Sequence, residues 1–241
     1  MDPASPGLVR MAAASDLRFA LPDLLARLHE AQPDLDVRVT YGSSGTFVGQ
    51  LVNGAPFDLF LSADVEYPKA LAARGLTVPG SEFTYAVGRL VLWVRASSSL
   101  DVEQRGMESL ADPAVAHVAI ANPAHTPYGR AAEAAMRQAG VYEQVAPKLV
   151  LGENVSQTMQ FVQAGSADAG LVALSLALAP AARPGGRFWT VPAAMHPRID
   201  QGGVILEKAV DLAAARRVRS FLMSEGARSI LRDYGFVLPE P

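Results

Sequence analysis

Short, mostly apolar runs alternate along the chain with stretches in which apolar residues recur every three or four positions. The runs at 8–14, 58–62 and 115–121 are typical of strands buried on both faces of a parallel sheet. After the first run, leucines at positions 17, 21, 24, 25 and 28 have the spacing of a helix with one buried face. The alternation predicts an α/β architecture with mainly parallel sheets.

Proline and glycine positions refine the predicted elements. Pro22 lies inside the leucine pattern, so the helix there is expected to begin late or to kink. A long β stretch is predicted over 83–94, with Gly88-Arg89 near its middle. Two helices, over 211–223 and 227–234, are expected to close the fold.

Five of the strand-like runs stop at or near a small or hydroxylated residue, and a helix-like run begins directly afterwards. A helix N-terminus offers unpaired backbone N–H groups and a partial positive charge, so it binds anions without any basic side chain. Five such junctions, spread over both halves of the chain, predict a cleft that holds a small oxyanion. The junctions follow Ser15, Ser44, Ala63, Tyr128 and Val155.

A short sequence repeat indicates two similar halves. Residues 50–53 (QLVN) are followed by Asp58, and residues 160–163 (QFVQ) are followed by Asp168 at the same separation. Each aspartate precedes a predicted strand, and each helix follows a turn of small residues. The repeat therefore predicts two related lobes that each supply helix ends to the cleft.

Composition limits the class of protein. The chain has 241 residues, of which 50% are hydrophobic and 19% are charged, which is typical of a globular protein with one large or two ordinary domains. A net charge of −3 without a long basic run argues against a nucleic-acid partner. The absence of cysteine excludes disulfides, zinc–thiolate sites and cysteine nucleophiles. No apolar run approaches the roughly 18 residues of a membrane span.

Sequence motifs for catalysis and cofactor binding do not occur. The turn Gly42-Ser43-Ser44-Gly45 resembles a nucleophile elbow, but Thr46 stands where the G-x-S-x-G pattern needs glycine. None of the four histidines lies in a motif that pairs it with a serine, and no P-loop, dinucleotide-binding or H-E-x-x-H pattern is found. We therefore expect no enzyme and no cofactor, with a triad assembled in space as the alternative.

Hydroxyl groups are the candidate ligand donors. Ser15 and Ser44 each stand where a helix is predicted to begin, so each either caps its helix or binds an anion. Tyr128 stands at a third helix start, where tyrosine is unusual as a cap. Convergent neutral donors hold a dianion without a counter-ion, and their number and placement determine the size of anion that the site selects.

At these junctions the chain resembles the periplasmic molybdate-binding proteins, the ModA family of ABC-transporter solute receptors. The resemblance covers nearly the whole chain from Leu8 onward, and NGAPFDLFLSAD and the NPxHxPYG turn are its most specific parts. The matching segments are AAASDL at 12–17, YGSSGTFVGQLVNGAPFDLFLSAD at 41–64, FTYAVGRLVLWV at 83–94, IANPAHTPYGRAA at 120–132, GENVSQTMQFVQAGSADAGLVALS at 152–175 and RSILRDYGFVLP at 228–239.

The resemblance implies the two-lobed type II periplasmic-binding-protein fold. In that fold each lobe is a mainly parallel sheet flanked by helices, and two crossing strands join the lobes. The crossings are expected near 83–88 and 198–204. Lobe one would then comprise residues 8–85 plus 199–241, and lobe two residues 86–198.

The resemblance also implies a set of oxyanion contacts. From lobe one these are the hydroxyls and amides of Ser15 and Ser44 and the amide of Ala63. From lobe two they are Tyr128 and the backbone amide of Val155. The metal is bound only as its oxyanion, so no side chain is expected to coordinate it directly.

Two positions depart from the family pattern. Ala173 stands where some members carry a tyrosine that donates its hydroxyl to the anion, and Tyr128 is expected to compensate. Asp16 stands where an uncharged residue is usual, and it is a possible additional contact through its amide. Its carboxylate is expected to point to solvent or to pair with a cation such as Arg18, because it would otherwise repel a dianion.

The implied function is capture of molybdate, and of tungstate, by hinge closure for the permease and ATPase of an ABC importer. The protein is expected to be a periplasmic monomer, or alternatively a lipid-anchored extracellular one. No signal peptide is recognised, and residues 1–7 read as an unstructured lead-in. The alternatives are a binding protein for sulfate, phosphate or a small carboxylate, and a cytosolic oxyanion-sensing domain of the same fold.

Overall fold

The computed structural model describes residues 7–239, so most of the predicted lead-in lies outside the described residues. The chain divides into two compact units. Within the described residues, unit 1 comprises 7–87, 200–233 and 237–239, and unit 2 comprises 88–199 and 234–236. The lobe limits expected from the sequence stay a prediction.

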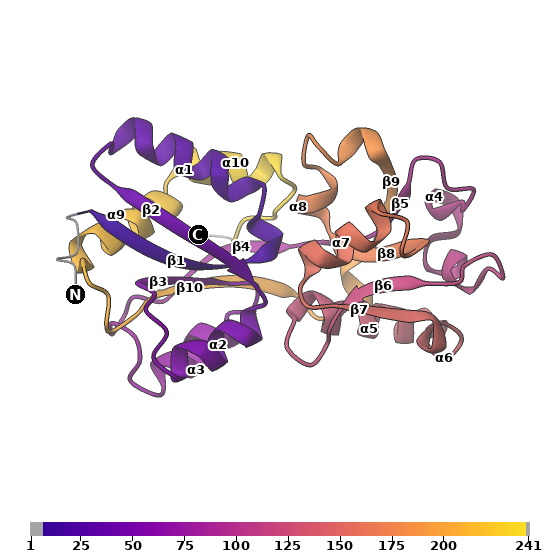
Figure 1. Cartoon of the computed structure of the whole chain (residues 1–241), viewed down its shortest axis with the longest axis horizontal. Helices are drawn as coiled ribbons and strands as arrows, with labels where there is room; N and C mark the ends of the chain where they lie inside the picture. The colour runs from indigo at the N-terminus through magenta and orange to yellow at the C-terminus, as the bar shows by residue number, and fades with distance from the viewer. Residues whose placement is uncertain (1–6, 240–241) are drawn as a thin grey trace. The chain divides into compact units, whose positions relative to one another are not determined.

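Unit 1 is built on a five-stranded sheet with the strand order β2-β1-β3-β10-β4 (Figure 1). The central strand of its parallel part, β1, pairs in parallel with both β2 and β3, and β10 pairs antiparallel with β3. The strands are β1 Leu8–Ala14, β2 Asp36–Gly42, β3 Leu59–Ser62, β4 Phe83–Gly88 and β10 Ile199–Ile205.

Helices cover both faces of this sheet. In Figure 1, α1, α9 and α10 lie together on one face, and α2 and α3 lie on the other. The helix expected after β1 begins late, as Pro22 predicted, because a short 3-10 turn precedes it and the proline falls in its first turn. The elements are η1 Ser15–Leu17, α1 Ala20–Ala31, α2 Ser44–Val52, α3 Glu66–Ala72, α9 Leu212–Leu222 and α10 Glu225–Asp233.

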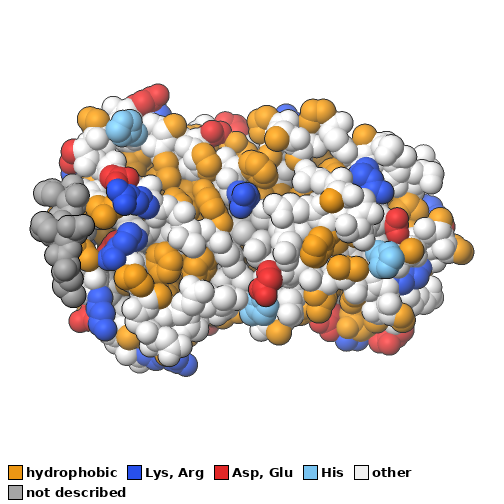
Figure 2. Space-filling model, viewed as in Figure 1, with side chains coloured by type: hydrophobic (Ala, Val, Ile, Leu, Met, Phe, Trp, Pro, Cys, Tyr) orange, Lys and Arg blue, Asp and Glu red, His pale blue; other side chains and the backbone are white. Residues whose placement is uncertain are grey.

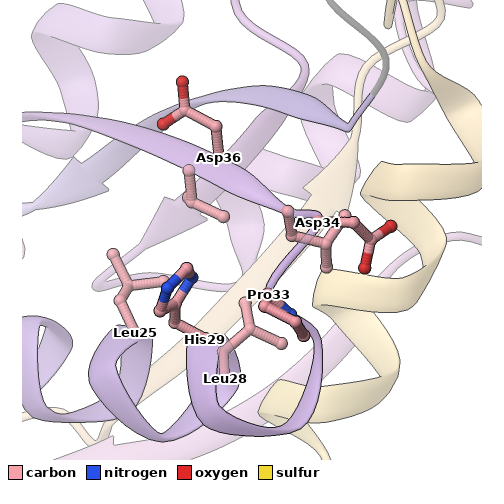
Figure 3. Close-up of a pocket in the computed structure, with 8 residues that line it drawn as sticks. Leu25, Leu28, His29, Pro33, Asp34 and Asp36 are labelled. Atoms are coloured by element: carbon pink, nitrogen blue, oxygen red, sulfur yellow. The ribbon is translucent and has the colours of Figure 1, made fainter.

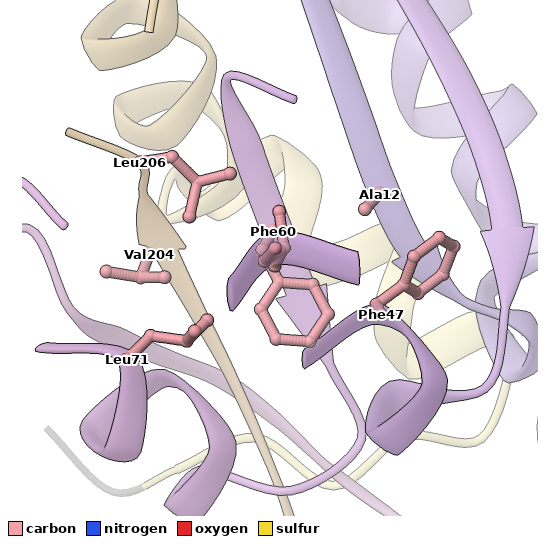
Figure 4. Packing of buried hydrophobic residues seen from close by; sticks show 7 residues of the cluster. Ala12, Phe47, Phe60, Leu71, Val204 and Leu206 are labelled. Carbon is pink, nitrogen blue, oxygen red and sulfur yellow. The ribbon is translucent and has the colours of Figure 1, made fainter. Parts of the chain in front are cut away.

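A hydrophobic cluster fastens α2 and α3 to the sheet of unit 1. Phe47 of α2 meets Phe60 of β3 edge-on, with 6.1 Å between the ring centroids. Leu71 of α3 packs in the same cluster (Figure 4). Because the cluster is buried, it holds the first turn of α2 against the carboxyl ends of the strands. Its members are Ala12, Phe47, Leu51, Phe60, Leu71, Val204 and Leu206.

Unit 2 repeats this plan with a sheet of order β7-β6-β8-β5-β9 (Figure 1). Strand β6 pairs in parallel with β7 and β8, and β5 pairs antiparallel with β8 and β9. The strands are β5 Leu90–Arg95, β6 Val118–Ala121, β7 Leu149–Gly152, β8 Ala169–Ala173 and β9 Gly186–Thr190.

Two long helices and several short elements complete unit 2. The long helices are α5 Pro127–Gln138 and α7 Val155–Gln163. The short ones are α4 Val102–Arg105, η2 Gly106–Ala111, α6 Tyr142–Val145, η3 Ala146–Lys148, α8 Leu174–Ala177, η4 Arg183–Gly185 and η5 Ala193–Met195.

The predicted fold class is confirmed, because each unit is a five-stranded sheet flanked by helices, with corresponding parallel groups β2-β1-β3 and β7-β6-β8. In each sheet a parallel group of three strands continues into antiparallel strands. The β stretch predicted over 83–94 is in fact two strands, β4 in one sheet and β5 in the other, which are interrupted at Arg89.

The sequence repeat corresponds to equivalent positions in the two units. The carboxylate of Asp58 accepts a hydrogen bond of 2.7 Å from the amide of Arg10, which lies on the neighbouring strand. The carboxylate of Asp168 accepts bonds of 2.8 and 2.9 Å from the amides of Ala116 and His117, just before the neighbouring strand β6. Each aspartate thus ties the entry of one strand to its parallel neighbour.

Candidate functional site

Two adjacent serines at the start of α2 have different roles. Ser43 is the N-cap, because its hydroxyl oxygen accepts from the amide of Thr46 at 3.4 Å. Ser44 is the first residue inside the helix, and it is 1% exposed. The capping interpretation of Ser44 is therefore wrong.

The hydroxyl of Ser44 is instead bound to the end of β3. The amide of Ala63, the residue after that strand, donates to Ser44 Oγ at 3.0 Å. A hydroxyl group has one donor and two acceptor positions, so this bond fills an acceptor position and leaves the proton to be donated. The hydrogen bond from the Ala63 amide therefore orients the hydroxyl group of Ser44.

Ser15 also does not cap its turn. The N-cap of η1 is Ala14, and no side chain caps it. Asp16 follows Ser15 and is 1% exposed, so the expected orientation toward solvent is wrong. Its carboxylate accepts a hydrogen bond from the side-chain amide of Gln201 on β10. Arg18, the predicted alternative partner, places its guanidinium 5.9 Å from the ring centroid of Tyr41.

In unit 2, Tyr128 stands in the first turn of α5. The cap is Thr126, whose hydroxyl oxygen accepts from the amide of Gly129 at 3.1 Å. Pro127 occupies the first helical position, where its missing N–H costs nothing. Gly129 is required there, because a Cβ atom would lie 2.1 Å from the carbonyl oxygen of Ala121. Tyr128 therefore has no capping role, and it is 2% exposed.

Val155 is the first residue of α7. The side-chain oxygen of Asn154, the N-cap, accepts from the amides of Ser156 and Gln157 at 3.1 and 3.0 Å. The cap therefore engages the second and third amides of the helix and not the amide of Val155. Ala173 ends β8 and is fully buried, so no hydroxyl is offered at that position.

The structure brings the predicted residues together in two groups, one in each unit. Half-site 1 comprises Ser15, Asp16, Ser44 and Ala63, which follow the carboxyl ends of the neighbouring strands β1, β2 and β3. Half-site 2 comprises Tyr128 and Val155, which follow the paired ends of β6 and β7. Ser15, Ser44 and Tyr128 carry hydroxyl groups and Val155 carries a backbone amide at a helix start, whereas the amide of Ala63 is already engaged by Ser44. Such donors are typical of anion sites that lack a basic side chain.

Two other kinds of site are not found among the described residues. Among residues 7–239, no group of three or more His, Asp or Glu side chains is placed to hold a metal ion. None of the helices in that range is long and apolar enough to cross a membrane. On the face shown in Figure 2, basic and acidic side chains are interspersed.

A cavity of about 400 Å³ lies between α1 and the start of β2, and its lining includes Leu25, Leu28 and His29 of the helix and Asp36 of the strand (Figure 3). Asp36 begins β2, whereas Ser44 follows its end, so this cavity is at the opposite edge of the sheet from half-site 1.

Sequence reasoning missed several residues that build these groups. The caps Ser43, Thr126 and Asn154 carry a recognisable signal, because a serine, threonine or asparagine precedes each apolar-periodic run. Gln201 carries no such signal, since it contacts Asp16 from 185 positions away.

Comparisons with known proteins place the chain among solute receptors. Residues 9–237 match the family model described as bacterial extracellular solute-binding protein. The chain is 40% identical over 235 residues to the molybdate-binding protein ModA of Rhodobacter capsulatus, covering 98% of this chain and 90% of that protein. It is 37% identical to ModA of Azotobacter vinelandii, covering 95% and 90% of the two chains.

A solved structure shows the same fold. The periplasmic molybdate-binding protein of Azotobacter vinelandii superposes with a TM-score of 0.90 at 33% identity, covering 96% of this chain and 100% of that one. Together these similarities confirm the resemblance that the sequence motifs indicated.

Proposed function

Because the chain belongs to the bacterial extracellular solute-binding proteins, and among them to the molybdate-binding ModA family of ABC transporters, we propose that it captures molybdate for an ABC importer through uncharged hydrogen-bond donors. The observation that carries this proposal is the position of the donors. Ser15 and Ser44 follow the ends of neighbouring strands in one unit, where the amide of Ala63 orients Ser44, and Tyr128 and Val155 follow paired strand ends in the other.

The local hydrogen bonding supports the proposed roles of Ser44 and Val155. Ser44 donates its hydroxyl proton, because Ala63 already occupies one acceptor position of that oxygen. Val155 donates its amide, because the cap Asn154 engages only the next two amides. Ser15 and Tyr128 donate their hydroxyl groups. Hydrogen bonds to an ion are about twice as strong as neutral ones, so a few such donors hold a dianion.

Partners and location are inferred from the family. ModA proteins bind an oxyanion and work with a membrane permease and its ATPase, and solute-binding proteins of this family are periplasmic or extracellular. We extend this to tungstate, which is also a tetrahedral dianion, to a monomeric state and to closure about a hinge. The ligand is bound and released without chemical change, so the protein acts as a receptor and not as an enzyme.

A competition experiment tests the ligand. The melting temperature should rise with molybdate and with tungstate, since a ligand that binds only the folded state stabilises it by mass action. Calorimetric competition with sulfate and phosphate, at matched ionic strength, then ranks the anions. Preference for phosphate over molybdate, or no melting shift with any oxyanion, would contradict the proposal.

A further inference from the structure

A hydrogen-bonded chain of buried polar groups begins at half-site 1 and runs along the same edge of the unit 1 sheet. The side-chain amide of Gln201 donates to Asp16 Oδ2. The hydroxyl of Tyr85 is 2.8 Å from Gln201 Oε1 and 3.2 Å from the carbonyl oxygen of Ser62. Asp16, Gln201, Tyr85 and Ser62 are all at most 3% exposed. Water is thus largely excluded from these bonds, and each partner depends on the others.

Tyr85 determines which groups donate and which accept in these hydrogen bonds. Burial, together with the charge of Asp16, raises the pKa of Tyr85 well above its ordinary value of 10.0, so its phenol stays a donor. Both oxygens near that phenol belong to acceptor groups, a side-chain carbonyl and a backbone carbonyl. Gln201 therefore turns Oε1 toward Tyr85 and its NH₂ group toward Asp16.

The sheet order explains how these residues meet. Tyr85 lies on β4, Gln201 on β10 and Ser62 on β3, which are consecutive in the sheet, and Asp16 follows β1, the next strand. Gly202, beside Gln201, pairs with Ser62. The polar chain thus runs along the edge of the sheet that carries Ser15, Ser44 and Ala63.

Asp16 needs such support if half-site 1 binds a dianion. The residue is adjacent to Ser15, so its carboxylate would approach the bound anion if it turned outward. Two like charges a few ångströms apart in a partly buried site repel each other strongly, because little water screens them. A donor that fixes the carboxylate on the protein side reduces this repulsion.

We propose that Gln201, oriented by Tyr85, is a positioning residue that holds the Asp16 carboxylate against the sheet, so that half-site 1 accepts a doubly charged tetrahedral oxyanion despite its acidic residue. This inference rests on the proposed function. It assigns a role in ligand binding to two residues that do not themselves touch the oxyanion.

A double-mutant cycle tests the role of Gln201. Gln201→Met keeps the side-chain volume and removes the donor, and Asp16→Asn removes the charge. We expect Gln201→Met to weaken molybdate binding in calorimetry by about tenfold or more, the usual effect of losing a hydrogen bond to a charged group. In the Asp16→Asn background, the same substitution should change affinity by no more than about twofold.

Two further variants separate positioning from simple destabilisation. Tyr85→Phe removes only the hydroxyl that orients Gln201, so it should weaken molybdate binding by a smaller factor than Gln201→Met does. In the Asp16→Asn background, Tyr85→Phe should again have little effect on the affinity. Ser81→Ala is the matched control, because Ser81 accepts from the amide of Ile205 at 3.2 Å at the far end of β10. It should lower the melting temperature without changing the affinity for molybdate.

The outcomes are distinct. Equal losses of affinity for Gln201→Met in both backgrounds would mean that the residue supports only the fold, which would overturn the inference and leave the proposed function standing. Failure of the unsubstituted protein to bind any tetrahedral oxyanion would overturn the proposed function, and the inference with it. Should Gln201→Met not fold, the Tyr85→Phe cycle gives the same decision.

Discussion

The backbone amide of Ala63 donates a hydrogen bond of 3.0 Å to the hydroxyl oxygen of Ser44, which lies nineteen positions earlier at the start of α2. Both residues are buried. The bond joins the end of β3 to the first turn of the helix and orients the Ser44 hydroxyl. The contact of the Ala63 amide with the oxyanion stays a prediction, whereas its contact with Ser44 is part of the structure.

Ser44→Ala should weaken molybdate binding by about 1.5–3 kcal/mol, because it removes a hydroxyl that donates to an anion. Calorimetric titration measures this difference. The neighbouring Ser43→Ala is the control, since it removes the cap of α2 but keeps the Ser44 hydroxyl. Ser43→Ala should lower the unfolding free energy by about 1 kcal/mol and change the affinity far less. Equal affinities for Ser44→Ala and the unsubstituted protein would show that Ser44 is not a ligand contact.

Gly129→Ala should destabilise unit 2, because the added Cβ would lie 2.1 Å from the backbone oxygen of Ala121, which cannot move aside cheaply. We expect a loss of about 2 kcal/mol or more in unfolding free energy, measured by denaturant titration. Gly49→Ala is the control within α2, where an added Cβ meets nothing within 4 Å. That substitution should be neutral or stabilise by up to about 1 kcal/mol, since alanine favours the helix. Similar effects at both glycines would contradict the close approach at Gly129.

Asp58→Asn should lower stability at neutral pH and lose its effect in acid. Burial by itself would raise the pKa of Asp58, but hydrogen bonds from the Arg10 side chain and from the amides of Val210 and Arg10 outweigh it and hold the pKa below its ordinary value of 3.8. A carboxyl group with a depressed folded-state pKa contributes stability that is fully present above the unfolded-state value. That contribution is lost as pH falls through the folded-state value.

Denaturant titrations between pH 7 and pH 3 check this dependence. The difference in unfolding free energy between the unsubstituted protein and Asp58→Asn should be about 2 kcal/mol near neutrality and shrink below the ordinary pKa of 3.8. The control is Asp36→Asn, which breaks an exposed pair with Arg38 and should cost less than about 1 kcal/mol. A difference for Asp58 that stays constant down to pH 3 would contradict the assignment.

Asn154→Ala should destabilise α7 by about 1 kcal/mol, because it leaves the amides of Ser156 and Gln157 without their cap. Hydrogen exchange at those two amides should become faster. Asn53→Ala is a suitable comparison, since its side chain forms an exposed bond to the carbonyl of Gly49 at the end of α2. If exchange in α7 does not change, the cap is not maintained in solution.

Local signals account for the parts of the fold that could be predicted. The apolar runs predicted β1, β3 and β6, and the leucine spacing with Pro22 predicted the late start of α1. Parallel pairing then brings Ser15 and Ser44 to one sheet edge, because carboxyl ends of neighbouring parallel strands coincide. The β pattern over 83–94 did not predict the break at Arg89, since both halves have the same β-like composition and only the sheets they join differ. A crossing near 83–88 was expected only from the family resemblance.

The amino-acid sequence by itself therefore determined the α/β alternation, the helix starts and the hydroxyl residues at them, because periodicity and capping act over a few neighbouring residues. Tertiary structure alone decided the hydrogen-bond partners of Ser44 and Asp16. Ser44 binds the end of a strand and not its own helix, and Asp16 turns inward to Gln201. Such partners lie far apart in the chain, and burial compels each polar group to find one.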